Sequence, residues 1–202
     1  RSVLLGSAAG LLGAAGQLVR FDALRRGPAY HVFPVISLSP VVSVLLSVLL
    51  LGETASPRAW TGIVFALLAM PLLSYQPRDP SRPVRGRLWF LLAFLVFLAW
   101  GIQAYVLRFA NATMRSESIF FYMMLTGLLF VPVAVWMTDF TKPINWGRSG
   151  PWLCAPIQLL NSIGALTMVY AFRYGKVIIV RPMINALAPV ITIVLSLVLY
   201  RV

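Results

Sequence analysis

The sequence predicts an all-α fold, a polytopic bundle of transmembrane helices built as an inverted five-plus-five helix repeat. Hydrophobic residues make up 60% of the 202 residues and charged residues only 11%, with a mean hydropathy of +0.87. Soluble domains, by contrast, contain about 25% charged residues. Long apolar segments recur along the chain, and the first two of them return near its end. An ordinary soluble enzyme and a disordered chain are therefore both excluded.

Seven apolar segments reach the length of about 17–25 residues that a membrane-spanning helix needs. They are 2–21, 30–51, 59–75, 88–107, 119–137, 152–172 and 177–200. None alternates polar and apolar residues as a barrel strand would, so each predicts a helix. The connections are short and charged, and the stretch 76–87, with four arginines, is the most linker-like part of the chain.

An internal repeat relates the first two helices to the last two. Shifting the sequence by 148 positions superimposes glycines and prolines in one register: Gly16 on Gly164, Gly27 on Gly175, Pro34 on Pro182 and, after one inserted residue, Pro40 on Pro189. Because five helices separate the copies, an odd number, the copies enter the membrane from opposite sides. This defines an inverted-topology repeat.

Extending the repeat predicts a ten-helix protein, of which this chain is a fragment that holds about helices 3 to 9. Residues 1–75 are then the last three helices of the first half, and 88–202 are the first four helices of the second half. Residues 76–87 form the linker between the halves.

The charge distribution bears on partners and chemistry. The net charge is +12, from 17 Lys and Arg against 5 Asp and Glu. These basic residues lie between apolar runs, which indicates topology control and attraction to lipid headgroups, with no nucleic acid as partner. A single cysteine, Cys154, and a single histidine, His31, give no basis for a disulfide or a metal site. No cofactor motif or reactive constellation is present, so we expect no enzyme.

Three motifs carry a family resemblance. The segment after Gly27-Pro28 has a proline at position 40 and closes with Gly52-Glu53, Trp100-Gly101 is followed by Arg108, and Pro189 repeats the mid-helix proline. These motifs resemble the EamA-type transporters of the drug/metabolite transporter (DMT) superfamily, over nearly the whole chain. One departure is Tyr200-Arg201, where Gly-Glu would parallel the earlier segment.

The resemblance implies a substrate cavity lined by the first, third and fourth helices of both halves. Polar side chains on the corresponding segments are its candidates: Gln17, Tyr30, Ser37, Trp100, Gln103, Gln158, Asn161 and Asn185. Buried polar groups in a membrane usually face a cavity or a partner helix. The alternative is that each Asn or Gln joins two helices by a hydrogen bond worth about 0.6 kcal/mol.

Prolines and the remaining polar groups complete the candidates. Interrupted helices in corresponding positions of two halves often flank a substrate site, so gating is expected at the helix-breaking residues Pro34, Pro40, Pro182 and Pro189. A structural kink is the alternative. Arg181 either attracts an anionic substrate or reaches the headgroups. The glycines from Gly6 to Gly16 predict close helix packing.

The resemblance implies a secondary transporter, a permease that moves a small organic metabolite, amino acid or drug-like compound by alternating access, as an efflux protein. We expect it in the bacterial inner (plasma) membrane. The alternative is a non-transporting scaffold or accessory subunit of the same fold, and a homodimer is left open. Positive-inside counting, ten Lys and Arg against seven, places the 76–87 linker in the cytoplasm. The family places it outside, and we adopt the family orientation.

Overall fold

The computed structural model describes residues 2–73, 87–138, 140–141 and 151–200 of the chain. In order, the helices are α1 (Ser2–Arg26), α2 (Ala29–Ser37), α3 (Ser39–Leu51), α4 (Pro57–Leu73), α5 (Leu88–Thr113), α6 (Ser116–Leu128), α7 (Val131–Trp136), α8 (Pro151–Tyr174) and α9 (Val177–Tyr200). No strand occurs within these residues. The predicted all-α class is therefore confirmed, while most of the 76–87 linker lies outside the described residues.

Two predicted segments are each divided into two helices. The segment 30–51 breaks at Leu38, between α2 and α3, and the segment 119–137 breaks at Leu129 and Phe130, between α6 and α7. With each divided pair taken as one span, five of the described helical stretches are long and apolar enough to cross a membrane. Pro57–Ala69 and Val177–Ile191 are shorter apolar helices.

Two helix ends lie beyond the expected boundaries. α1 continues to Arg26 and α5 to Thr113, so the predicted ends at 21 and 107 are wrong. Hydropathy marks where apolar residues stop, whereas a helix continues through polar residues that suit its last turn. Arg25 and Arg26 occupy the last turn of α1, where positive charge is favourable beside the carbonyl end of the helix dipole.

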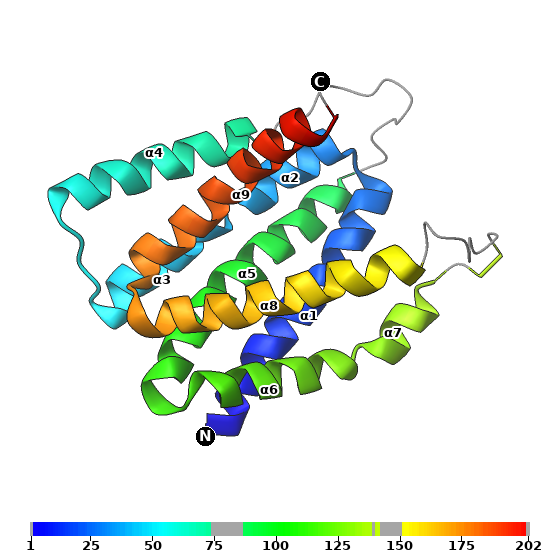
Figure 1. Cartoon of the computed structure of the whole chain (residues 1–202), viewed down its shortest axis with the longest axis horizontal. Helices are drawn as coiled ribbons and strands as arrows, with labels where there is room; N and C mark the ends of the chain where they lie inside the picture. The colour runs from blue at the N-terminus through cyan, green and yellow to red at the C-terminus, as the bar shows by residue number, and fades with distance from the viewer. Residues whose placement is uncertain (1, 74–86, 139, 142–150, 201–202) are drawn as a thin grey trace.

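Helix α5 lies at the centre of the bundle and packs against α1, α2, α3, α8 and α9 (Figure 1). α1 runs antiparallel to it: Gly13 contacts Gln103, Gly16 contacts Trp100, and Gly27 contacts Trp89. Across from α5, a Cβ at Gly10 of α1 would lie 2.8 Å from the Met123 backbone of α6. The predicted close packing of the α1 glycines is thus confirmed.

Three apolar clusters form the core. The first joins α1, α5, α6, α8 and α9 around residues such as Leu107 and Phe172. The second joins α1, α2 and α5 around Val32 and Val96, and the third joins α3, α4 and α9. On α5, the first two clusters are separated by the stretch from Trp100 to Gln103. This stretch lies near the middle of a helix that runs from Leu88 to Thr113.

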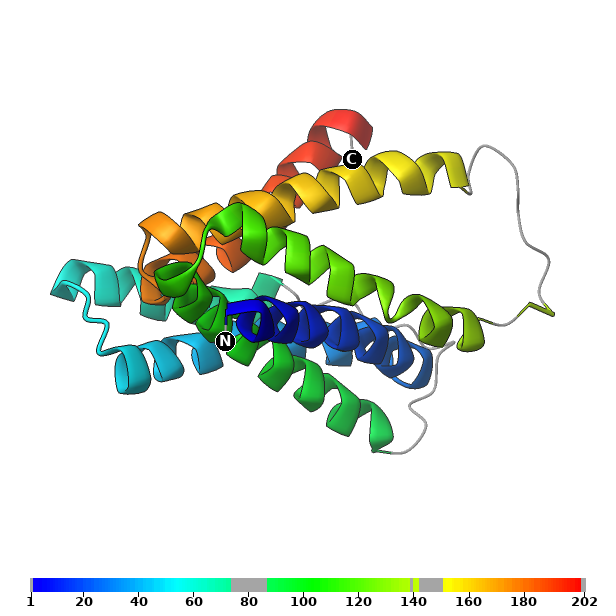
Figure 2. The same cartoon turned by 90° about the horizontal axis from the view of Figure 1, so that it is seen from below.

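Helix α8 is covered at one end only. Val169 and Phe172 are fully buried, whereas Ile157 and Leu160 in its first half are more than half exposed. Figure 2 shows the same asymmetry, because α8 meets the other helices where it joins α9 and diverges from α6 and α7 toward its N-terminal end. This divergence decides which predicted polar residues meet.

Candidate functional site

The Gly52-Glu53 motif ends α3 and redirects the chain. Gly52 adopts a left-handed conformation with φ of 62°, which a glycine tolerates because it has no Cβ. The Glu53 N–H then donates to the Ser47 carbonyl at 3.1 Å and closes the helix end. The Glu53 side chain, only 8% exposed, is turned toward α5 and α9.

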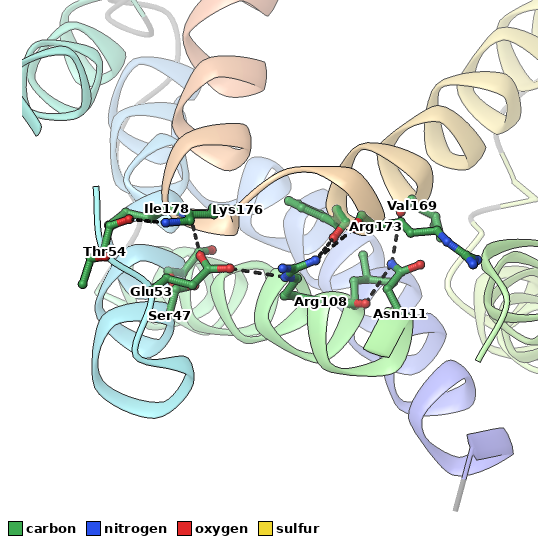
Figure 3. A network of polar contacts seen from close by, with 12 residues as sticks. Ser47, Glu53, Thr54, Arg108, Asn111, Val169, Arg173, Lys176 and Ile178 are labelled. Carbon is green, nitrogen blue, oxygen red and sulfur yellow. Dashed lines mark hydrogen bonds and ion pairs between the residues drawn. The ribbon is translucent and has the colours of Figure 1, made fainter. Parts of the chain in front are cut away.

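The Glu53 carboxylate joins two other elements (Figure 3). Oε2 accepts the Ile178 N–H at 3.1 Å, in the first turn of α9. Free N–H groups and the helix dipole favour an anion at such an N-terminus. Oε1 accepts a hydrogen bond from Arg108 Nε of α5, in an ion pair of 3.3 Å.

Arg108 also donates hydrogen bonds to the C-terminal end of α8. Its Nη1 donates to the carbonyls of Phe172 and Arg173 at 2.9 and 3.1 Å, so a cation sits where the helix leaves carbonyls without partners. We call Glu53, Arg108, Asn111 and Lys176 the junction network. Asn111 Nδ2 donates to Val169 O at 3.1 Å, and Lys176 Nζ donates to Thr54 O at 2.7 Å. The network fastens the α8–α9 turn to the ends of α3 and α5.

A second group of polar residues lies deeper, around the middle of α5. Trp100 packs on Gly16 of α1, and Gln103 Nε2 donates to the Ala9 carbonyl of α1 at 3.0 Å. Gly101 faces α3, where Ser43 Oγ donates to its carbonyl at 3.0 Å. Gln103 thus forms the interhelical bond that the alternative interpretation expected.

Two arginines and a serine flank this position. The Arg20 guanidinium lies 5.7 Å from the centre of the Trp100 ring, and Arg181 Nη2 donates to the Trp100 carbonyl at 3.4 Å. The Ser39 carbonyl faces Gly101. Arg20 Nε, Ser39 Oγ and Arg181 Nε are buried without a hydrogen-bond partner. We call Arg20, Ser39, Trp100, Gly101 and Arg181 the Trp100 layer.

The other candidates are dispersed. Gln17 and Asn185 are half-buried, and Tyr30 is buried with its ring 4.5 Å from that of His31. Ser37 Oγ donates to Pro34 O of its own helix at 2.8 Å. Gln158 and Asn161 are exposed on the diverging half of α8, so the structure does not bring them to Trp100 and Gln103.

The prolines differ between the two halves. Pro40 follows the break at Leu38 and opens α3, whereas Pro34 lies inside α2. Pro182 and Pro189 both lie inside α9, which is continuous through them. The break in the first half therefore has no counterpart in α9, where neighbouring groups can satisfy the freed carbonyls.

Three described cavities lie away from the Trp100 layer. One of about 340 Å³ is lined by apolar residues of α4 and α9, including Ile63 and Pro182. Two others, of about 430 and 230 Å³, lie between α1 and α7 and share Leu18 and Met137. The two cavities between α1 and α7 lie toward the end of the bundle opposite the junction network.

The junction network was only partly predictable from the sequence. Glu53 and Arg108 both belong to the motifs that carried the family resemblance, yet neither was a predicted site residue. Their spacing of 55 residues gives no indication that they pair. Among the residues that the structure describes, no group of three or more His, Cys, Asp or Glu side chains is placed to hold a metal ion.

Comparisons with known proteins agree with this architecture. The model of the EamA-like transporter family matches residues 2–75 and 87–202. A solved crystal structure, whose title states no function, is similar over 97% of this chain and 68% of its own, with a TM-score of 0.72. At 21% identity this likeness shows the fold alone. A comparison with curated proteins gives no match.

Proposed function

Because the chain belongs to the EamA-like transporter family, we propose that it is a secondary transporter that exports a small organic metabolite, amino acid or drug-like compound. Its apolar helices and its family make it an integral membrane protein. The observation that carries the proposal is the Trp100 layer, where buried polar atoms from α1, α3 and α9 lack partners around the middle of α5. Such groups in a membrane bundle mark a substrate path.

We place the candidate substrate site at this layer, whose residues line none of the three described cavities. Gln17, Tyr30, Ser37 and Asn185 lie on the helices that surround it. Gln158 and Asn161 would join the cavity only if the first half of α8 closed onto α1. The predicted halves, 1–75 and 88–202 with the linker 76–87 between them, provide the two bodies that rock about the site.

The junction network supports one step of alternating access. It holds the α8–α9 turn against α3 and α5, so this end of the bundle is closed. In the family orientation this end faces the cytoplasm of the bacterial inner membrane. Opening it requires the Glu53–Arg108 pair to separate, and the break at Leu38 provides a place where α2 and α3 bend.

The proposal is tested by profiling metabolites inside and outside cells that produce the protein, with empty-vector cells as control. A compound that accumulates outside only with the protein identifies the substrate. Asn185→Ala and Gln103→Ala are expected to reduce its export several-fold while membrane levels stay normal. Thr61→Ala is the matched control, because Thr61 is exposed on α4 and bonds only its own helix.

Two outcomes would contradict the proposal. If no compound moves while the protein sits in the membrane, and a partner protein co-purifies with it, the scaffold function replaces transport. If export occurs but both cavity variants transport at the wild-type rate, the position of the cavity is wrong.

A further inference from the structure

We propose that the transported compound is an organic oxyanion whose carboxylate or phosphate group is held by Arg181, with Arg20 beside it in the Trp100 layer. This proposal rests on the transport function above and names its substrate class. For Arg181 the sequence left two alternatives, an anionic substrate or the lipid headgroups, and it assigned no role to Arg20. The structure supplies three independent observations: the burial of Arg181, the pairing of the carboxylates, and the depth of the layer.

Arg181 is a buried cation with weak partners. Its side chain is 7% exposed, Nη1 contacts the Met168 sulfur at 3.6 Å, and Nη2 reaches the Trp100 carbonyl at 3.4 Å. Its Nε has no partner. Burying a charge in this way is unfavourable unless an opposite charge and further hydrogen bonds compensate it. A guanidinium offers a planar fork of donors that fits a carboxylate or a phosphate.

The described carboxylates are engaged elsewhere. Asp22 pairs with Arg26 at 3.0 Å, Glu53 with Arg108, and Glu117 accepts the Tyr170 hydroxyl at 2.6 Å. None of the three forms an ion pair with Arg20 or Arg181. The described part of the chain thus provides no anion for either guanidinium, and a substrate anion would complete both.

The depth of Arg181 distinguishes binding from attraction to headgroups. The Trp100 carbonyl that it contacts lies eight residues before Arg108 along α5. At 1.5 Å per residue this is about 12 Å further into the bundle than the junction network. Arg181 therefore points inward, whereas a side chain that reaches the headgroups extends toward the membrane surface. A lipid headgroup does not sit at this depth.

The repeat relates the two arginines. Arg20 of α1 corresponds to Met168 of α8, 148 positions later, and Phe33 of α2 corresponds to Arg181 of α9. Arg181 contacts Met168 directly. The two halves thus place one arginine each on this pair of helices, on the first helix in one half and on the second helix in the other. Ser39, at the start of α3, lies beside the same layer, and its buried hydroxyl, which has no hydrogen-bond partner, can donate to an oxyanion.

The test uses the full chain purified in detergent and four probes that share one ring. Benzoate and phenylphosphonate are anions, benzamide is neutral, and benzamidine is a cation. A ligand that binds the folded state raises the midpoint of thermal unfolding, and the stabilisation grows with the logarithm of its concentration above Kd. We expect a rise with at least one anion at millimolar concentration and none with benzamide or benzamidine. Equal shifts with all four probes, or no shift with either anion, would overturn the proposal.

Variants assign the binding to Arg181. Arg181→Met removes an uncompensated buried charge, so we expect the ligand-free midpoint to stay or rise while the anion-dependent shift is lost. Arg181→Lys retains the charge without the planar fork and is expected to weaken anion binding about tenfold. Arg58→Gln, at an exposed position of α4, is the control and is expected to keep both the ligand-free midpoint and the anion-dependent shift of the wild type. A lower ligand-free midpoint in Arg181→Met with an unchanged anion shift would show a structural role and refute the proposal.

The outcome separates this inference from the transport function. An exported compound without an acidic group, whose export Arg181→Met leaves unchanged, overturns the anion site and leaves transport intact. An anion-dependent shift that Arg181→Met abolishes, in a protein that moves no compound, supports the site and contradicts transport.

Discussion

At the residue scale, the Glu53–Arg108 pair places each charge where two helix ends favour it. The carboxylate lies at the N-terminus of α9 and the guanidinium at the C-terminus of α8, so each charge also interacts favourably with a helix dipole. The hydrogen bonds to backbone groups compensate the removal of both charges from water. The pair therefore holds together the end of α3, helix α5 and the α8–α9 turn.

Removing one partner tests this arrangement. Glu53→Ala leaves Arg108 without its counter-ion and the Ile178 N–H without its acceptor. Removing one partner of a buried ion pair typically lowers the free energy of unfolding by about 3–5 kcal/mol. We expect about 3 kcal/mol in the free energy of unfolding, because the Arg108 side chain is 32% exposed. Glu53→Gln keeps an acceptor and is expected to lose less.

The measurement is unfolding of the purified protein in detergent. Glu117→Ala is the matched control, since the ion pair of Glu117 with Arg115 and its hydrogen bond from the Tyr170 hydroxyl are both exposed, and its midpoint is expected to fall much less than that of Glu53→Ala. Equal destabilisation by Glu53→Ala and Glu117→Ala would contradict the fastening role.

At the element scale, small residues set how closely the helices approach. A Cβ at Gly10 would lie 2.8 Å from the Cα and carbonyl oxygen of Met123, which are backbone atoms and cannot rotate away. A Cβ at Gly62 of α4, by contrast, would have no neighbouring atom within 4 Å. The two glycines are both helical, so they differ chiefly in their neighbours.

This difference predicts opposite effects of one substitution. Gly10→Ala forces α1 away from α6, and overpacking of this kind typically costs about 1–3 kcal/mol. Gly62→Ala meets open space and is expected to be neutral or to stabilise by up to about 1 kcal/mol, the difference in helix propensity. Chemical unfolding of both variants in the same detergent measures the difference. A similar stability for both variants would show that the α1–α6 contact is looser than described.

The elements also show how far the sequence predicts the fold. Hydropathy located all seven helical segments, because membrane spans differ sharply from their connections in composition. Hydropathy did not locate the breaks at Leu38 and Leu129–Phe130, although the break at Leu38 lies between Pro34 and Pro40, two of the predicted helix-breaking residues. The break at Leu129–Phe130 was not predicted. Nor did hydropathy place Gln158 and Asn161, since the exposed side of α8 is decided by how that helix diverges from its neighbours.

At the scale of the whole molecule, the site depends on contacts between distant segments. The repeat and the motifs predicted the helices that surround a cavity, with Trp100 and Gln103 among its candidate residues. Periodicity alone did not reveal that Arg20, Ser39 and Arg181, on three different helices, all lie beside Trp100 and Gly101 of α5. Residues separated by 161 positions give no local sign that they approach the same tryptophan.

Transport requires the junction network to open, and cross-linking the network closed tests this requirement. Lys176 Nζ lies 2.7 Å from Thr54 O, so cysteines at positions 54 and 176 are within reach of a short bifunctional methanethiosulfonate, which joins them through two reducible disulfide bonds. In a Cys154→Ala background, the Thr54→Cys and Lys176→Cys pair is expected to lose export when cross-linked and to recover it on reduction. Each single-cysteine variant should keep export under the same reagent. If fully cross-linked protein exports at the rate of the uncross-linked protein, the junction network does not need to open for transport.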